Sequence, residues 1–273
     1  MSTTNPTTRW ACGLSYDGTG FCGWQIQPAG AAPKPALQNV VEAALEKIAG
    51  HPVATRCAGR TDAGVHALQQ VIQFDTGAER PPNAWVRGVN TWLPAGVAVR
   101  WAVPVDSGFD ARFGATARTY WYALLDTPVC PPLWRERVGW THRRLDPARI
   151  SEAAACLLGN HDFSAFRASE CQAASPVRTI ESIEVVRDGA FVLMAVTANA
   201  FLHHMVRNLV GALVYVGDGR RPVEWMAQVL ASRNRSFAAP TFAASGLYLA
   251  SVRYDPQWQL PIAVRAPRVC ELV

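Results

Sequence analysis

The chain of 273 residues is 49% hydrophobic and 17% charged, which is typical of a globular protein with a sizeable core. No apolar run approaches the length of a membrane span, and the polar residues 1–8 lack the pattern of a secretory signal, which argues against membrane and secreted proteins. The net charge is +5, and 24 of the 26 basic residues are arginine, because lysine occurs only at positions 34 and 47. Arginine suits phosphate, so the charge favours a nucleic-acid partner, although genomic base composition can also enrich arginine.

The seven cysteines are scattered along the chain and form no CxxC pair. This distribution argues against a disulfide framework and against a zinc site. It predicts a reducing compartment, the cytoplasm.

The first half of the chain predicts the order β-α-β-β-α-β. Apolar residues on one helical face, with Gly50 just beyond, predict the first helix, and a proline opens the second. Alternating valines predict the closing strand. The predicted elements are a strand at 10–16, a helix at 36–48, strands at 53–58 and 68–75, a helix at 82–92 and a strand at 97–105.

The second half repeats this order. Asp146 and Gly159 mark the two ends of a helix, and Asp188–Gly189 marks a hairpin turn. The predicted elements are a strand at 117–125, a helix at 147–158, hairpin strands at 180–187 and 191–197, helices at 201–216 and 223–231, and a strand at 247–254.

Two such halves in tandem predict an α+β protein. Each half reads as a ferredoxin-like, RRM-like βαββαβ unit with an antiparallel sheet and helices on one face, the open face resembling an RNA-recognition platform. The order of elements matches between the halves without a residue-level repeat. We expect an N-terminal subdomain of residues 1–108 and a C-terminal subdomain of residues 109–273, divided near residues 106–114.

The most distinctive motif is GRTDAGVHA, residues 59–67, between two predicted strands. Its carboxylate, Asp62, follows Arg60 by two residues, and a neighbouring positive charge favours the ionised form of an acid. An ionised, positioned carboxylate can act as a nucleophile or a base. The segment alone is equally compatible with an ordinary Asp-Ala-Gly turn. A second turn acid, Asp17 in YDGTG, is interpreted as structural, and His66 as a residue that fixes the loop by hydrogen bonding.

GRTDAGVHA resembles the signature of the TruA family of tRNA pseudouridine synthases. The resemblance continues in YDGTGFCGWQIQP (16–28), ARFGATARTYWY (111–122), GNHDFSAF (159–166), ANAFLHHMVRNLVGALVYVG (198–217) and GLYLASVRY (246–254). These blocks run nearly end to end in the family's order. The resemblance implies two merged sheets with the active cleft between the halves, a homodimer, and a tRNA substrate modified at uridines 38, 39 and 40 of the anticodon stem-loop.

The same resemblance implies roles for four residues. Asp62 is expected to be the catalytic acid, Tyr120 to stack on the target base, Arg207 to pair with Asp62, and Arg60 to contact the target nucleotide or a phosphate. Within the strand, Tyr122 shares a face with Tyr120, so spacing alone does not separate the two tyrosines.

Cofactors and metals are not expected. His203 and His204 are adjacent within the helix predicted at 201–216, where neighbouring side chains point about 100° apart. Neither HExxH nor another ligand spacing supports a metal site. P-loop and GxGxxG motifs are also missing.

Three alternatives remain open on the sequence. They are a non-catalytic RNA-binding protein on the same fold, a pseudouridine synthase with other RNA targets, and a nucleoside hydrolase. Whether Asp62 acts on the sugar or on the base is likewise open.

Overall fold

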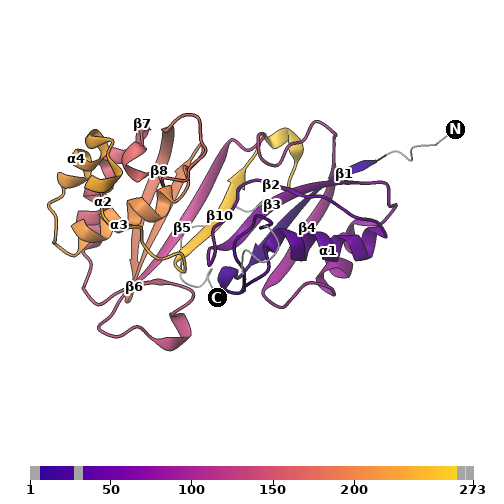
Figure 1. Cartoon of the computed structure of the whole chain (residues 1–273), viewed down its shortest axis with the longest axis horizontal. Helices are drawn as coiled ribbons and strands as arrows, with labels where there is room; N and C mark the ends of the chain where they lie inside the picture. The colour runs from indigo at the N-terminus through magenta and orange to yellow at the C-terminus, as the bar shows by residue number, and fades with distance from the viewer. Residues whose placement is uncertain (1–6, 28–32, 263–267, 269–273) are drawn as a thin grey trace. The chain divides into compact units, whose positions relative to one another are not determined.

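The computed structural model describes residues 7–27, 33–262 and 268, and the chain divides into two compact units (Figure 1). The first unit comprises Met1–Thr116 and Leu249–Val264, and the second comprises Ala117–Tyr248 and Arg265–Val273. Both units combine strands with a few helices, which confirms the predicted α+β class. The expected subdomain limits, 1–108 and 109–273, stay a prediction.

Four strands belong wholly to the first unit: β1 (Thr8–Tyr16), β2 (Arg56–Cys57), β3 (His66–Thr76) and β4 (Val97–Val105). Strand β1 lies between β3 and β4 and is antiparallel to both, while β2 pairs with β3. Trp10 of β1 therefore stands opposite Phe74 of β3 and Pro104 of β4. The strand β10 (Leu247–Arg253) starts in the second unit and ends in the first.

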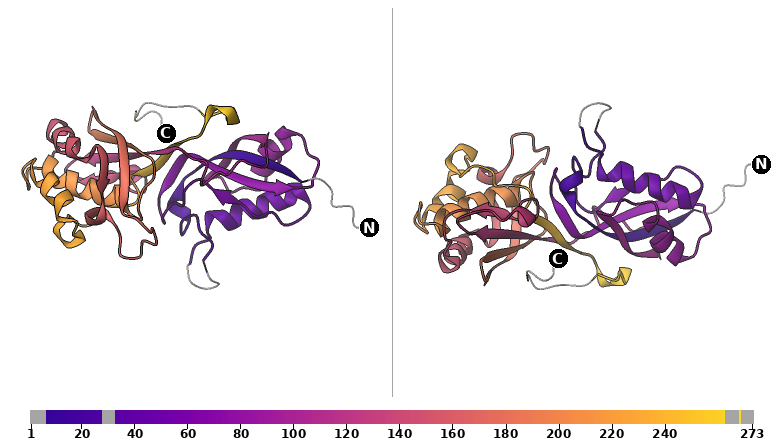
Figure 2. Two further views of the ribbon diagram at one scale, coloured as in Figure 1. Left: turned by 90° about the horizontal axis from the view of Figure 1, so that it is seen from above. Right: turned by 90° about the horizontal axis from the view of Figure 1, so that it is seen from below.

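Helix α1 (Leu37–Ala49) presents one apolar face to the core of the first unit, and Figure 2 shows it alongside that unit's strands. Its buried residues recur at helical spacing, as predicted: Leu37, Val41, Ala44 and Leu45. Gly50 ends the helix with a left-handed φ of 77°, which a glycine adopts without steric cost.

The helix predicted at 82–92 is present over residues 82–90, and its middle, Ala84–Gly88, is π-helical. Trp85 lies fully buried within this turn. Its ring packs 5.7 Å from that of Trp10 and 5.1 Å from that of Phe74, so the turn is anchored on the central strands.

The second unit contains β5 (Ala117–Asp126), β6 (Gly139–Thr141), β7 (Gly159–Asp162), β8 (Val177–Asp188) and β9 (Phe191–Ala198). The antiparallel order is β5-β9-β8-β7, and β6 pairs with β5 in parallel. The helices are α2 (Pro147–Ala154), α3 (Met205–Gly217) and α4 (Trp225–Ser232). Helix α2 contacts α3, α4 and β8, and α4 also contacts α3 (Figure 1).

Two predictions of local structure, a strand and a helix, are wrong in part, and two short strands were not predicted. The strand expected at 53–58 is limited to Arg56–Cys57, because only these residues pair with β3. The helix expected at 201–216 begins at Met205, because His204 takes a left-handed φ of 59°. Strands β6 and β7 were not predicted, since their short sequences GWT and GNHD show no clear alternation of apolar and polar residues.

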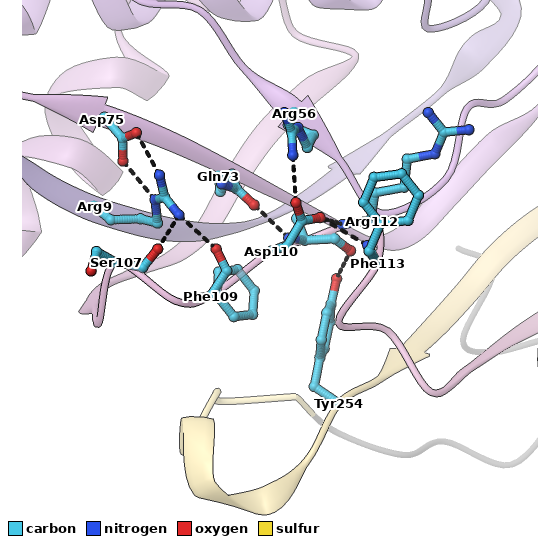
Figure 3. A network of polar contacts seen from close by, with 11 residues as sticks. Arg9, Arg56, Gln73, Asp75, Ser107, Phe109, Asp110, Arg112, Phe113 and Tyr254 are labelled. Atoms are coloured by element: carbon cyan, nitrogen blue, oxygen red, sulfur yellow. Dashed lines mark hydrogen bonds and ion pairs between the residues drawn. The ribbon is translucent and has the colours of Figure 1, made fainter.

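The segment that follows β4 is fastened to the first unit by polar contacts (Figure 3). Arg9 of β1 makes a two-pronged ion pair with Asp75 of β3 and donates to the carbonyl oxygens of Ser107 and Phe109. The bond from Arg9 holds the pKa of the Asp75 carboxyl below its ordinary value. The guanidinium of Arg9 thus joins β1 and β3 to the segment that follows β4.

A second set of contacts continues along the same segment (Figure 3). Arg56 pairs with Asp110, and the buried side chain of Gln73 accepts a hydrogen bond from the Ala111 amide. The Tyr254 hydroxyl donates to the Ala111 carbonyl at 2.6 Å. The motif residues 111–116 are therefore held against β3 and the end of β10, all within the first unit.

Among the residues that the model describes, no helix is long and apolar enough to cross a membrane.

Candidate active site

The GRTDAGVHA motif forms the connection between β2 and β3. Thr61 in this loop is buried, Asp62 is partly buried and Arg60 is exposed. Thr61 accepts a main-chain hydrogen bond from Trp24 at 2.9 Å, and Asp62 forms an isolated antiparallel bridge with Gly23. The acid therefore lies in a loop whose backbone is itself hydrogen-bonded.

A tight turn follows the acid directly. The Val65 amide donates to the Asp62 carbonyl at 3.1 Å, and Gly64 has a φ of 76°. A positive φ at the third position of such a turn is typical of type II and favours glycine. The Asp-Ala-Gly turn expected from the sequence is therefore present, with the candidate catalytic acid at its first position. Gly59, by contrast, has no positive φ.

The segment of residues 16–24, which begins with YDGTG, packs against this loop without space for side chains at two of its glycines. A Cβ atom on Gly18 would lie 2.1 Å from the Val65 carbonyl oxygen, and one on Gly23 would lie 2.7 Å from that of Thr61. Gly23 also has a φ of 101°. These two glycines are needed because the two backbones approach each other closely.

His66 joins the loop to the same segment. Its ring is buried, and Nδ1 accepts a hydrogen bond from the Gly18 amide at 3.1 Å. The same nitrogen lies 3.2 Å from Asp17 Oδ1, and Asp17 also accepts from the Thr19 amide at 3.0 Å. These contacts support the structural interpretation of Asp17 and the loop-fixing interpretation of His66.

Sequence reasoning missed three buried residues, Tyr16, Thr61 and Gln70, whose side chains hydrogen-bond to one another beneath the GRTDAGVHA loop. The Tyr16 hydroxyl lies 2.9 Å from Thr61 Oγ1, and the amide of Gln70 donates to Tyr16 Oη at 3.3 Å and to the Gly59 carbonyl at 2.6 Å. Gln70 is fully buried. The available signal was a set of amide side chains, Gln69, Gln70 and Gln73, inside an otherwise apolar strand.

Burial separates the two tyrosines that strand spacing leaves equivalent. Tyr120 on β5 is partly exposed and contacts Phe201 edge-on, with ring centroids 5.1 Å apart. Tyr122 is fully buried, and its hydroxyl donates to the Ala243 carbonyl at 2.7 Å. Burial raises the pKa of the Tyr122 hydroxyl. Only Tyr120 of this pair has ring surface exposed for a ligand.

Arg207 lies in the first turns of α3 and is partly buried. Its Nε donates to the Phe242 carbonyl at 2.9 Å, and the Phe242 amide donates back to the Arg207 carbonyl at 3.2 Å. The guanidinium is therefore held by the main chain at Phe242 and is not fully solvated. These two bonds hold both the side chain and the main chain of Arg207 against Phe242.

The residue next to Arg207 anchors the same helix end. Asn208 is fully buried, and its Nδ2 donates to the Phe166 carbonyl at 2.8 Å. Its Oδ1 accepts from Arg235 at 3.1 Å and from Thr241 at 2.6 Å. Arg207 thus lies at a helix end where the neighbouring Asn208 side chain has hydrogen-bond partners for both its nitrogen and its oxygen.

The predicted geometry of His203 and His204 is wrong. Both residues precede α3, and their rings lie with centroids 4.0 Å apart and planes inclined by 34°. The helical spacing of about 100° does not apply to them, because the left-handed backbone at His204 places both residues before the helix. The expectation of no metal site therefore rests on the missing ligand motifs and not on ring orientation.

The proposed site residues divide between the two units. Arg60 and Asp62 share one loop of the first unit, and Tyr120 and Arg207 belong to the second. The pairing of Asp62 with Arg207 stays a prediction from the resemblance.

Comparison with known proteins identifies the family. A family model described as tRNA pseudouridine synthase matches residues 14–114 and 153–255, which include Arg60, Asp62 and Arg207, while Tyr120 lies between the two matched segments. Proteins named tRNA pseudouridine synthase A are 54% identical over 253 residues in Paraburkholderia phytofirmans and 53% identical over 257 residues in Herminiimonas arsenicoxydans, each alignment covering 93% of this chain and 92% of the relative. A third, from Thiobacillus denitrificans, is 54% identical over 93% of this chain and 96% of its own length. On this match and these identities, the chain belongs to the tRNA pseudouridine synthase family.

Proposed function

We propose that this protein isomerises uridine to pseudouridine at positions 38, 39 and 40 in the anticodon stem-loop of tRNA, with Asp62 as the catalytic acid. The observation that carries the proposal is the setting of Asp62. It is a partly buried carboxylate in a hydrogen-bonded loop, within a chain of the tRNA pseudouridine synthase family.

The isomerisation of uridine can be catalysed by one well-placed carboxylate. Isomerisation breaks the C1′–N1 bond, turns the base and joins C1′ to C5, so no atom is gained or lost and no redox cofactor is needed. A glycosidase usually places two carboxylates on opposite sides of the bond it cleaves. The single acid of GRTDAGVHA fits an isomerase better. Asp62 acts either on the sugar or on the base.

The other three residues complete the proposed site. Tyr120 stacks on the target base, an interaction worth roughly 1–3 kcal/mol. Bases in an anticodon stem-loop are stacked or paired, so the target must be flipped out at a cost of a few kcal/mol. Arg60, which is exposed, contacts the target nucleotide or a phosphate. Arg207 pairs with Asp62 and holds its carboxylate in position.

The proposed fold detail is a tandem of ferredoxin-like, RRM-like βαββαβ halves, residues 1–108 and 109–273. The order of elements supports it. In the first half β1, α1, β2, β3, the helical residues 82–90 and β4 follow one another. In the second half β5, α2, β8, β9, α3 and β10 occur in that order, with β6, β7 and α4 between them. We place the protein in the cytoplasm, where its tRNA substrate is found.

The test of the proposed activity is a transcript experiment. Purified protein is incubated with unmodified tRNA transcripts that carry uridine at 38, 39 or 40, and with matched transcripts that carry cytidine there. We expect pseudouridine at those positions alone. Release of free uracil would indicate a hydrolase, pseudouridine at other positions would indicate a different target, and binding without product would indicate an RNA-binding protein.

We also propose a homodimer, and an apolar surface in the second unit supports it. Val129 and Leu133 are 75% and 90% exposed, and beside them a groove of about 490 Å³ is lined in part by Val138 and Trp140. A surface with both a protruding side chain and a recess can pair with itself about a two-fold axis. Exposed apolar patches commonly mark such contacts.

Leu133→Asp should therefore weaken the dimer while leaving the fold intact. We expect light scattering to give a dimer mass for the wild-type protein and a shift to monomer for the variant. Leu158→Asp, at a 44% exposed leucine elsewhere in the second unit, serves as the matched control and should stay dimeric. A monomeric wild-type protein at micromolar concentration would contradict the proposal.

A further inference from the structure

The loop that carries Asp62 alternates between an inner and an outer side. Thr61 is 6% exposed, whereas Arg60 before it is exposed and Asp62 after it is partly exposed. Successive side chains of an extended segment point to opposite sides, so fixing Thr61 inward aims both neighbours outward. The contacts of Thr61 therefore bear on the direction of the candidate catalytic acid.

A buried set of hydrogen bonds holds this inner side. Gln70 on β3 donates to the Gly59 carbonyl at 2.6 Å and accepts from the Gly59 amide at 3.4 Å. It also donates to Tyr16 Oη at 3.3 Å, and Tyr16 Oη in turn lies 2.9 Å from Thr61 Oγ1. Because Tyr16 accepts from Gln70, its own hydrogen can be donated to Thr61. We call Tyr16, Thr61 and Gln70 the loop brace.

The loop brace spans two rigid strands. Tyr16 ends β1 and Gln70 lies within β3, and both side chains are buried. The loop backbone is also pinned where Trp24 donates to the Thr61 carbonyl at 2.9 Å. Thr61 thus has its main chain held from one segment and its side chain from another, which leaves the Asp62 backbone little freedom to rotate.

We infer that Tyr16, Thr61 and Gln70 are positioning residues that set the direction of the Asp62 carboxylate through the hydroxyl of Thr61. They act through the loop and do not touch the substrate. The inference rests on the proposed catalytic role of Asp62. Burying these three polar side chains would destabilise the folded protein if they had no partners. The hydrogen bonds of the loop brace satisfy them and so offset that penalty.

The test compares two changes at one position. Thr61→Val keeps the shape of the side chain and removes the hydroxyl, whereas Thr61→Ser keeps the hydroxyl. A misplacement of about 1 Å can cost roughly 100-fold in rate, so we expect Thr61→Val to lower kcat for pseudouridine formation by about 10- to 100-fold with KM for tRNA nearly unchanged. Thr61→Ser should restore kcat to within about threefold of the wild-type value.

Thr76→Val is the matched control for lost stability. Thr76 is buried at the far end of β3, the strand that carries Gln70, and its Oγ1 lies 2.8 Å from His51 Nε2. This variant therefore also loses a buried hydroxyl, but at the end of β3 that is distant from the loop. Both valine variants should lower the melting temperature, and only Thr61→Val should lower kcat. Equal effects of the two variants on kcat would overturn the inference.

A double-mutant cycle tests whether the brace acts as one unit. Tyr16→Phe removes the hydroxyl that reaches Thr61, so the double variant Tyr16→Phe, Thr61→Val should be no slower than the slower single variant. Fold-losses that multiply would show that the two hydroxyls act independently and would overturn the inference. An active Asp62→Asn enzyme would instead refute the proposed function, whereas an inactive one with a fully active Thr61→Val would refute this inference alone.

Discussion

We expect Asp62→Asn to abolish pseudouridine formation while the protein stays folded and still binds tRNA. The substitution is nearly isosteric and removes the charged oxygen that would attack or deprotonate. Loss of a nucleophile or base typically costs roughly 10⁴-fold or more in kcat. The main-chain contacts of Asp62, to Val65 and Gly23, are equally available to asparagine, so the loop backbone should keep its path. Single-turnover assays at saturating enzyme measure the chemical step.

The control for this variant is Asp75→Asn in the same unit. Asp75 on β3 is paired with Arg9 on β1. Loss of this ion pair should lower stability and leave the loop around Asp62 in place. We expect Asp75→Asn to have wild-type kcat with a lower melting temperature. The pKa of the Asp75 carboxyl is held below its ordinary value by Arg9, so its contribution to stability is present at neutral pH and is lost as the pH falls through that lowered pKa. Near wild-type turnover by Asp62→Asn would refute the catalytic assignment.

Much of the fold follows from local sequence patterns. Helix α1 has both its apolar spacing and its terminal glycine in the sequence, and the structure agrees with the prediction to within one residue at each end. The hairpin of β8 and β9 was likewise predicted by Asp188–Gly189 between two apolar runs. Elements whose limits depend on distant partners were predicted less well. Strand β2 ends where its pairing with β3 ends, and no local pattern marks that point.

The candidate site shows the same division. The GRTDAGVHA motif and its turn glycine are visible in the sequence, and Gly64 has the positive φ that such a turn favours. The loop brace was not predictable, because Tyr16 is separated by 45 residues from Thr61 and by 54 from Gln70. The geometry of His203 and His204 was also beyond local reasoning, since one left-handed residue ends the helical pattern before α3. Side-chain burial, and not spacing, distinguishes Tyr120 from Tyr122.

Arg207→Ala should slow isomerisation while leaving the salt dependence of tRNA binding almost unchanged. As a partner of Asp62, Arg207 would neutralise the carboxylate and not a phosphate, so its removal should release no fewer counterions on binding. Without the guanidinium the carboxylate loses the partner that holds it in position, and we expect single-turnover rates to fall by about 100-fold. Arg207→Lys keeps the charge without the planar fork that bonds Phe242, and its rate should be intermediate.

Arg60→Ala provides the contrast that makes the salt measurement decisive. Arg60 is exposed on the same loop as Asp62, and it is proposed to contact the target nucleotide or a phosphate. If the contact is to a phosphate, its removal should weaken binding and reduce the slope of log K against log salt by about 0.7–0.9. The two arginines are then separated by two readouts on the same tRNA, the slope for Arg60 and the chemical step for Arg207. If Arg207→Ala instead lowers the slope by about one unit and leaves single-turnover isomerisation unaffected, Arg207 clamps a phosphate and its pairing with Asp62 is wrong.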